Sequence, residues 1–349
     1  MLTRRLFLAG GTAITALVLG DLRGSRPTSA QGRSVNLYSS RHYDTDEALF
    51  AGFTRSSGMG TNLIEATANE LIARIKSEGR NSPADVLITV DAGNLWMAEQ
   101  EDLLVPVDSE ILKSRIPEGL RHPQGRWFGF STRARVIFYN RDRVKPEQLS
   151  TYEDLASPKW RGQILMRSSS NIYNQSLVAS LIAVHGTTRT EEWLRGFVRN
   201  FARPPEGNDT SQIRDCAAGR GHITLANTYY YARLAKSSDP ADQEVVRKVG
   251  LFFPNQANRG THVNISGAGV LRHAPNREGA IAFLEHLTTP EAQGYFSSGN
   301  NEYPVVEGSP LDPVVAGFGQ FKADLETGAV KYGQNQAEAI RLMDRAGWR

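Results

Sequence analysis

Four tyrosines occupy the same kind of position in this chain of 349 residues. Tyr43, Tyr173 and the pair Tyr229-Tyr230 each lie in a loop that follows a short apolar run and precedes an amphipathic segment. Such runs and segments have the patterns of strands and helices. Ligands of open α/β sheets bind at this edge, beyond the carboxyl ends of the strands. We therefore expect the four phenols to converge on one cleft, with Tyr43 on one wall and the other three opposite.

Converging phenols would suit a strongly Lewis-acidic metal ion. A phenol has a pKa near ~10, so holding one ionised at pH 7 costs roughly 4 kcal/mol, and holding four costs roughly 16 kcal/mol. Only an ion that binds hard, charged oxygens tightly offsets this cost. Fe(III) fits best, because hard oxygen ligands favour hard cations and a site without thiolates disfavours copper(I) and zinc.

Two arginines could balance the charge of such a site. Four phenolates around a trivalent ion leave one net negative charge. Arg133 lies near an expected crossover between lobes, and Arg233 follows Tyr229 by four residues, on the same face of the expected helix. We interpret both as cations that lie behind the ligands. Tyr231 is not expected to be a ligand, because three consecutive residues cannot share one helix face.

The mature chain alternates expected strands and helices, which predicts an α/β fold. Asp44 and Glu47 form a capping box for the first helix, which ends at Gly58. We expect strands at residues 35–39, 61–65, 85–90, 135–139, 163–166, 222–226, 249–254 and 264–271. The further expected helices lie at residues 69–78, 175–185, 190–200, 276–287 and 290–299.

The pattern predicts two lobes that the chain crosses twice. Residues 129–133 lead into the strand at 135–139, and the strand at 264–271 leads back. We therefore assign residues 31–132 and 262–349 to lobe 1 and residues 133–261 to lobe 2. Two crossings imply a hinge, so closure of the lobes would complete a site between them.

The first thirty residues predict an export signal. Arg4-Arg5 precedes an uncharged stretch of fifteen residues, and Thr28-Ser29-Ala30 forms a cleavage site of small residues. The stretch is shorter than the ~20 residues that span a bilayer, so we expect no stable membrane insertion. The arginine pair followed by Leu-Phe-Leu resembles a twin-arginine signal, which exports folded proteins, with an ordinary secretory signal as the alternative.

Composition argues against several other classes of protein. Beyond residue 30 the chain has 36 basic and 36 acidic residues and no compact Lys or Arg block, so nothing favours a nucleic-acid partner. Cys216 is the only cysteine, which excludes an internal disulfide and a cysteine-based zinc or iron–sulfur site. The sequence also has no nucleophile elbow, Walker loop or dinucleotide fingerprint.

Three segments resemble motifs of one known family. They read SSRHYDTD at residues 39–46, RSSSNIYN at 167–174 and NTYYY at 227–231. In this order they resemble the bacterial ferric-binding proteins of ABC iron uptake, in particular the FutA branch of cyanobacteria. The resemblance extends over essentially the whole mature chain. It implies a two-lobed class II periplasmic-binding-protein fold with the ligand cleft between the lobes.

The resemblance also implies a set of ligands. Tyr43, Tyr173, Tyr229 and Tyr230 would hold the iron without a separate synergistic anion, and either His42 or water would complete the coordination. The cargo would be Fe(III), with Fe(II) left open, because reduction would loosen a phenolate site. A monomer in the periplasm would deliver the ion to an ABC permease driven by a cytoplasmic ATPase.

Two other functions stay open at this point. A mononuclear non-haem iron oxygenase also uses tyrosinate and histidine, but it needs open coordination positions, and four tyrosines leave little room. A solute-binding protein for a small organic ligand would line its pocket with tyrosines that never ionise. The expected function is a binding protein that catalyses no reaction.

Overall fold

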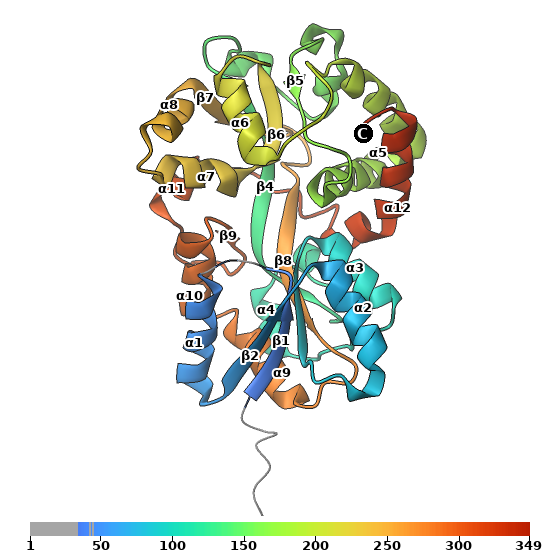
Figure 1. Ribbon diagram of the computed structural model, residues 1–349, viewed down its shortest axis with the longest axis vertical. Coiled ribbons are helices and arrows are strands. Elements are labelled where there is room, and N and C mark those ends of the chain that lie inside the picture. The colour runs from blue at the N-terminus through green and yellow to red at the C-terminus, as the bar shows by residue number, and fades with distance from the viewer. Residues whose placement is uncertain (1–33, 42, 44) are drawn as a thin grey trace, which may run out of the picture. The chain divides into compact units, whose positions relative to one another are not determined.

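The computed structural model describes residues 34–41, 43 and 45–349, which belong to one compact unit (Figure 1). In this part of the chain, nine strands join in the order β2-β1-β3-β8-β4-β6-β5, with β7 and β9 paired to β4. We call the elements around β1, β2 and β3 lobe 1, and those around β5, β6 and β7 lobe 2. The predicted two-lobed α/β class is confirmed. The predicted export signal lies outside the described residues.

Lobe 1 is organised around a central parallel strand. Its strands are β1 (Ser34–Ser39), β2 (Gly60–Glu65), β3 (Val86–Val90) and β8 (Val263–Val270). β1 lies between β2 and β3 and runs parallel to both, whereas β3 pairs with β8 in antiparallel fashion. Val35 and Leu37 of β1 have no exposed surface, and Tyr38, which points to the opposite face, is 1% exposed. Burial on both faces fixes β1, so the loop that carries Tyr43 leaves from a rigid strand end.

The long strand β4 (Phe128–Asn140) belongs to both lobes. Its first half pairs with β8, from Phe128–Ala268 to Ala134–Val263, and all of its residues are buried. Its second half pairs with β6 and β7. β9 (Tyr303–Pro304) also pairs with its first half. The strand predicted at 135–139 is therefore the second half of a longer element that joins the lobes.

Lobe 2 holds a smaller sheet next to the second half of β4. Its strands are β5 (Ile164–Leu165), β6 (Ile223–Asn227) and β7 (Val249–Phe252). β5 runs parallel to β6, and both β6 and β7 run antiparallel to β4. β6 is buried along its whole length. Helices α5 and α7 thus begin beyond the carboxyl ends of neighbouring parallel strands.

Helices cover the sheets of both lobes. They are α1 (Asp46–Ser57), α2 (Ala68–Glu78), α3 (Ala92–Gln100), α4 (Glu110–Arg115), α5 (Ile172–Arg199), α6 (Asp209–Ala217), α7 (Thr228–Lys236), α8 (Pro240–Lys248), α9 (Arg277–His286), α10 (Pro290–Gly294), α11 (Pro313–Ala316) and α12 (Ala329–Arg345). None of the helices in the described part of the chain combines the length and the apolar character that a membrane span requires.

Some elements differ from the sequence-based predictions. The helices predicted at 175–185 and 190–200 form one element, α5, interrupted at Gly186, where φ is 75°. A capping box occurs at Thr67 and Glu70 of α2. The predicted capping residue Asp44 lies outside the described residues, and α1 starts at Asp46. The helix predicted at 290–299 continues after α10 as a π-helical turn, Tyr295–Gly299.

The C-terminal helix α12 is an element that the sequence analysis did not anticipate. It packs on α5 and on α3. Its buried residues include Tyr332 and Leu342. The division of the chain at residues 132 and 262 stays a prediction, because α12 contacts elements on both sides of it.

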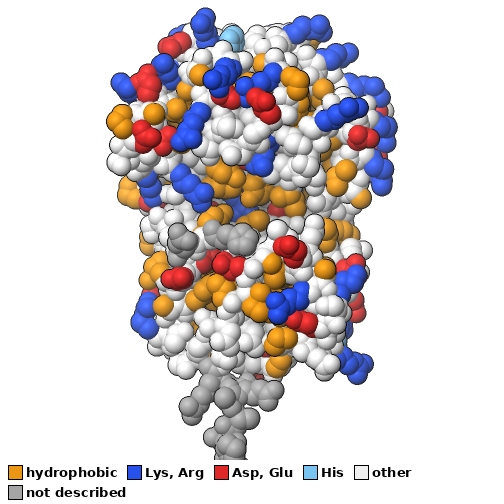
Figure 2. Space-filling model, in the orientation of Figure 1, with side chains coloured by type: hydrophobic (Ala, Val, Ile, Leu, Met, Phe, Trp, Pro, Cys, Tyr) orange, Lys and Arg blue, Asp and Glu red, His pale blue; other side chains and the backbone are white. Residues whose placement is uncertain are grey.

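Charge is divided unequally along the chain. Residues 133–261 carry 19 Lys and Arg against 12 Asp and Glu, whereas residues 31–132 and 262–349 together carry 17 against 24. Figure 2 shows Lys and Arg side chains over much of the visible surface of lobe 2. The even total charge therefore hides a positive segment, and this segment holds three of the four tyrosines. A positive potential favours phenolate over phenol.

Candidate metal site

The structure places all four tyrosines next to strand ends. Tyr43 lies in the loop between β1 and α1, and Tyr173 is the second residue of α5, which follows β5. Tyr229 and Tyr230 are the second and third residues of α7, which begins directly after β6. Three phenols thus belong to the first turns of helices. The partial positive charge of a helix N-terminus stabilises an anion placed there.

The tyrosines of the two lobes are brought together. The Tyr229 hydroxyl donates to the Tyr173 hydroxyl at 3.4 Å, and the ring centroids of Tyr229 and Tyr230 lie 4.1 Å apart. The guanidinium carbon of Arg233 lies 5.4 Å from the ring centroid of Tyr43 and 5.1 Å from that of Tyr229. Arg233 therefore faces a tyrosine from each lobe.

Burial favours the neutral form of all four phenols. It raises the pKa of Tyr229 well above the ordinary value, and the neighbouring tyrosines raise it further. Burial likewise raises the pKa of Tyr173 and of Tyr230, and it raises the pKa of Tyr43 to about 12. The Arg133 charge opposes burial at Tyr43, Tyr173 and Tyr229. Only a strong Lewis acid would ionise the whole set near neutral pH.

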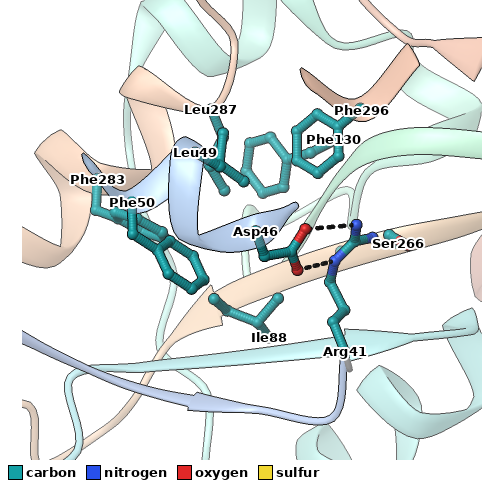
Figure 3. Close-up of a pocket in the computed structure, with 11 residues that line it drawn as sticks. Arg41, Asp46, Leu49, Phe50, Ile88, Phe130, Ser266, Phe283, Leu287 and Phe296 are labelled. Atoms are coloured by element: carbon teal, nitrogen blue, oxygen red, sulfur yellow. Dashed lines mark hydrogen bonds and ion pairs between the residues drawn. The ribbon is translucent and has the colours of Figure 1, made fainter. Parts of the chain in front are cut away.

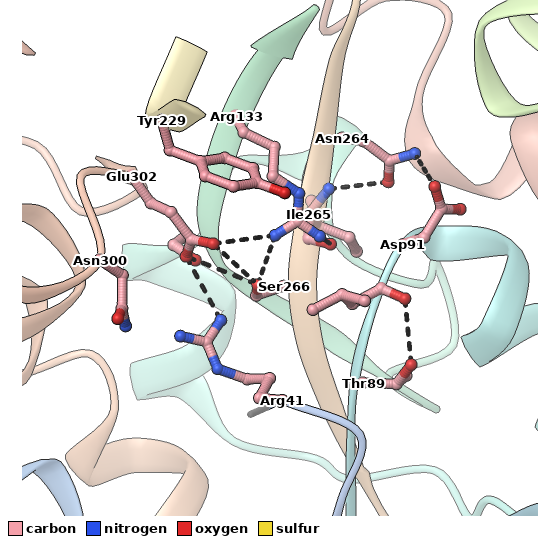
Figure 4. Close-up of polar contacts among 12 residues, drawn as sticks. Arg41, Thr89, Asp91, Arg133, Tyr229, Asn264, Ile265, Ser266, Asn300 and Glu302 are labelled. Carbon is pink, nitrogen blue, oxygen red and sulfur yellow. Dashed lines mark hydrogen bonds and ion pairs between the residues drawn. The ribbon is translucent and has the colours of Figure 1, made fainter. Parts of the chain in front are cut away.

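Arg133 and Glu302 form a buried ion pair beside the tyrosines (Figure 4). The Arg133 guanidinium lies 5.6 Å from the Tyr173 ring centroid and donates to Glu302 Oε1 at 3.0 Å. It also donates to the Ser266 hydroxyl at 2.6 Å. Burial raises the pKa of Glu302, but the charges of Arg41 and Arg133 lower it below its usual range. Glu302 is therefore ionised at neutral pH.

Arg41 belongs to the same charged network. Its guanidinium lies 4.7 Å from the Tyr43 ring centroid and donates to Glu302 Oε2 at 3.3 Å. It also donates two hydrogen bonds to Asp46, of 2.9 and 3.2 Å. Figure 3 shows this pair beside apolar side chains that line a cavity of about 10 Å³, among them Phe296. The cavity is at the lower limit for one water molecule, and the side chains of Arg41 and Asp46 are almost fully buried.

Sequence reasoning missed Glu302 and Arg41 as parts of the site. Arg41 lies within the motif at 39–46, but its residue type gives no sign of a metal ligand, because a guanidinium has no lone pair to offer. Glu302 is remote in sequence from every predicted site residue. Asp46, the last residue of the same motif, forms an ion pair with Arg41.

The remaining candidate donors are His42, Tyr231 and any cluster of His, Cys, Asp or Glu. His42, a candidate for an additional ligand, lies outside the described residues. The Tyr231 hydroxyl donates to the backbone carbonyls of Val246 and Val249, so this side chain faces α8 and β7. Among the residues that the structure describes, no group of three or more His, Cys, Asp or Glu could hold a metal ion. The four tyrosines are thus the candidate oxygen donors for a metal ion.

Known proteins resemble this chain over most of its length. A family model described as bacterial extracellular solute-binding protein matches residues 81–317. Iron uptake protein A2 of Synechocystis sp. is 60% identical over 349 residues, which is 99% of each chain. A solved Trichodesmium structure, described as FutA in complex with iron and citrate ligands, is 62% identical, with a TM-score of 0.88 over 90% of this chain and 100% of that chain. The ferric binding protein from Campylobacter jejuni is 39% identical, with a TM-score of 0.83 over 90% of this chain and 100% of that one.

Proposed function

This chain belongs to the bacterial extracellular solute-binding protein family, and we propose that it captures Fe(III) through Tyr43, Tyr173, Tyr229 and Tyr230 for delivery to an ABC importer. The family consists of solute-binding proteins rather than enzymes, which argues against an iron oxygenase. The relatives named for iron uptake and ferric-iron binding support iron as the cargo.

The convergence of four phenols with arginines carries the proposal, with Tyr229 buried and the other three half-buried. Arg41 is paired with Asp46, and Arg133 is paired with Glu302. Arg233 forms no ion pair with any residue in the described ranges. Its exposed side chain lies over the rings of Tyr43 and Tyr229. Four phenolates and Fe(III) carry one net negative charge, which the single charge of Arg233 balances.

The same charge balance favours Fe(III) over Fe(II). With Fe(II), four phenolates would carry two net negative charges, one more than the charge of Arg233 balances. Hard anionic oxygens also favour the trivalent ion. Fe(II) is therefore a weaker cargo in this proposal, and reduction is a route to release. His42 and water are the alternatives for any further coordination position.

The partner and the compartment follow from the family and from the N-terminal sequence. Solute-binding proteins of this kind pass their cargo to a permease that a cytoplasmic ATPase drives. The arginine pair and the apolar stretch of residues 1–30 support export to the periplasm through the twin-arginine pathway. Export after folding would let the protein adopt its ligand geometry before it meets competing metals.

The test is spectroscopic. Protein loaded with a ferric nitrilotriacetate complex should turn red-purple, because phenolate-to-Fe(III) charge transfer absorbs visible light, and acid should remove the colour. Tyr229→Phe should weaken Fe(III) binding strongly. Tyr231→Phe is the matched control, since this neighbour on the same helix faces away. A colourless ferric mixture, or equal affinity in both variants, would overturn the proposal in favour of an organic ligand.

A further inference from the structure

A second buried arginine of β4 lies behind the tyrosines of lobe 2. Arg135 is 1% exposed and two residues after Arg133. One of its terminal nitrogens donates to Asn227 Oδ1 at 3.2 Å. The other donates to Asn174 Oδ1 at 2.5 Å and to Asp209 Oδ1 at 3.3 Å. The guanidinium thus joins two amides that are 53 residues apart in the sequence.

Both amides adjoin the candidate iron ligands. Asn174 directly follows Tyr173 in the first turn of α5. Asn227 is the N-cap residue of α7 and precedes Tyr229 by two residues. The backbone positions of all three lobe 2 tyrosines are therefore at most three residues from a side chain that Arg135 holds.

The Asn227 side chain has an unusual arrangement for an N-cap. An N-cap asparagine ordinarily accepts a hydrogen bond from the backbone of its own helix. The Asn227 side chain makes no such bond, and its Nδ2 has no partner among the described residues. Its oxygen instead accepts from Arg135. The side chain thus bonds to Arg135 and does not cap α7.

Asn174 is held from two directions. Its Oδ1 accepts from Arg135, while its Nδ2 donates to the carbonyl oxygens of Arg167 at 3.3 Å and Ser168 at 3.0 Å. These carbonyls belong to the loop that leads to Tyr173. The start of α5 is therefore tied to β4 through Arg135 and to its own preceding loop.

We propose that Arg135 is a positioning residue that sets Tyr173 against the Tyr229-Tyr230 pair, an inference that rests on the proposed ferric function. It would act through Asn174 and Asn227. A guanidinium suits this role, because its planar fork offers several donors in fixed directions, whereas a lysine ammonium offers one nitrogen on a flexible stem. Supporting residues of metal sites commonly change affinity 10- to 100-fold when replaced, roughly.

A purely structural role is the competing explanation. Arg135 also forms an ion pair with the buried Asp209, which itself pairs with Arg167. If this pair only stabilises lobe 2, the arginine could be replaced by any residue that keeps the charge. Arg135→Lys separates the two roles, since lysine keeps a positive charge for Asp209 and loses the fork. Asn227→Ala separates them further, since it leaves the pair intact.

The experiment compares Fe(III) affinity, by competition with a chelator, in the full-length mature protein and its variants. Arg135→Lys and Asn227→Ala should each lower the affinity by about tenfold or more and shift the charge-transfer band. Asn276→Ala is the control, because Asn276 caps α9 in lobe 1 with an ordinary bond to the Gly279 amide. It should lower the melting temperature and leave affinity and band unchanged.

The outcomes separate this inference from the proposed function. Absence of Fe(III) binding in the unmodified protein would overturn the function itself. Normal binding there, with unchanged affinity and band in Arg135→Lys and Asn227→Ala, would overturn the positioning role alone. If Arg135→Lys does not fold, Asn227→Ala and Asn174→Ala decide the matter, and affinity within twofold of the unmodified protein in both would reject the inference.

Discussion

The two lobes support their tyrosines in different ways. Tyr43 of lobe 1 lies in a loop next to charged groups, with Arg41 paired to Asp46 and to Glu302. The tyrosines of lobe 2 lie at helix starts, where the neutral amides of Asn174 and Asn227 receive hydrogen bonds. Lobe 1 therefore places a charged network beside its single phenol, and lobe 2 adds neutral amides at the starts of the helices that carry the other three.

This difference suggests an order of events. Tyr173, Tyr229 and Tyr230 already contact one another within lobe 2, so an ion could meet three phenols before the lobes close. Tyr43 belongs to lobe 1, so we expect it to complete the site when the lobes close. Arg233 extends from lobe 2 over the Tyr43 ring, which brings a cation to the developing negative charge at that step. We expect capture by lobe 2 and completion by lobe 1.

Proton release should show the largest effect, because each bound phenolate has lost a proton. Burial raises the pKa of all four phenols, and Arg41, Arg133, Arg233 and Glu302 face them. The folded phenols are thus neutral at pH 7, and Fe(III) binding should release four protons. Affinity should then rise up to about 10⁴-fold per pH unit and fall with acid.

A pH-stat titration, corrected for protons of the chelator, measures this release. Tyr43→Phe should release three protons, and the double variant Tyr229→Phe with Tyr230→Phe should release two. These counts divide the site between the lobes as three phenols and one. Equal counts for the unmodified protein and Tyr43→Phe would show that lobe 1 contributes no phenolate.

The charged support of lobe 1 should matter most for folding. Glu302→Gln leaves the buried guanidinium of Arg133 without a carboxylate partner among the described residues. Removing one partner of a buried ion pair destabilises a protein by about 3–5 kcal/mol. Chemical denaturation of the apo protein measures this, with the exposed Glu307→Gln as the control. A loss as small as that of the control would argue against an ionised Glu302.

The strands and the four tyrosines of the site could be predicted from the sequence, because the patterns that mark them are local. Apolar runs marked the strands, and the residue type and loop position of Tyr43, Tyr173 and the Tyr229-Tyr230 pair marked the site. Phenols also have few uses as a converging set, which narrowed the chemistry. The proximity of Arg233 to Tyr229 followed from helical periodicity alone.

Contacts between distant segments could not be read in the same way. Glu302 meets Arg41 across 261 residues, and no periodicity links positions so far apart. In the sequence, Arg135 is one of many arginines. Only the strand pairing shows that it lies behind the starts of α5 and α7. Asn227 looks like an ordinary N-cap residue, and only the observed side-chain direction shows that it is not. These contacts arise from the tertiary structure, and local sequence patterns carry no information about them.

The next effect distinguishes the ligands of the two lobes. Tyr229→Phe should lower Fe(III) affinity by more than ~100-fold, the upper range for residues that only support a metal site. Tyr43→Phe should lower it less, because three phenols remain in contact within lobe 2. Competition with a ferric chelator gives both values. A larger loss for Tyr43→Phe than for Tyr229→Phe would show that the phenols of lobe 2 do not dominate the binding free energy.

The smallest effect concerns the cation that spans the cleft. Arg233→Gln removes the charge that lies over both Tyr43 and Tyr229 and leaves the buried pair of Arg133 and Glu302 intact. Because Arg233 is exposed, water and salt screen its charge, and we expect a loss of Fe(III) affinity of about tenfold at low salt. Arg233→Lys is the matched control that keeps the charge. The difference between the two variants should shrink as salt is added, whereas a salt-independent difference would mean that Arg233 acts by packing on the rings.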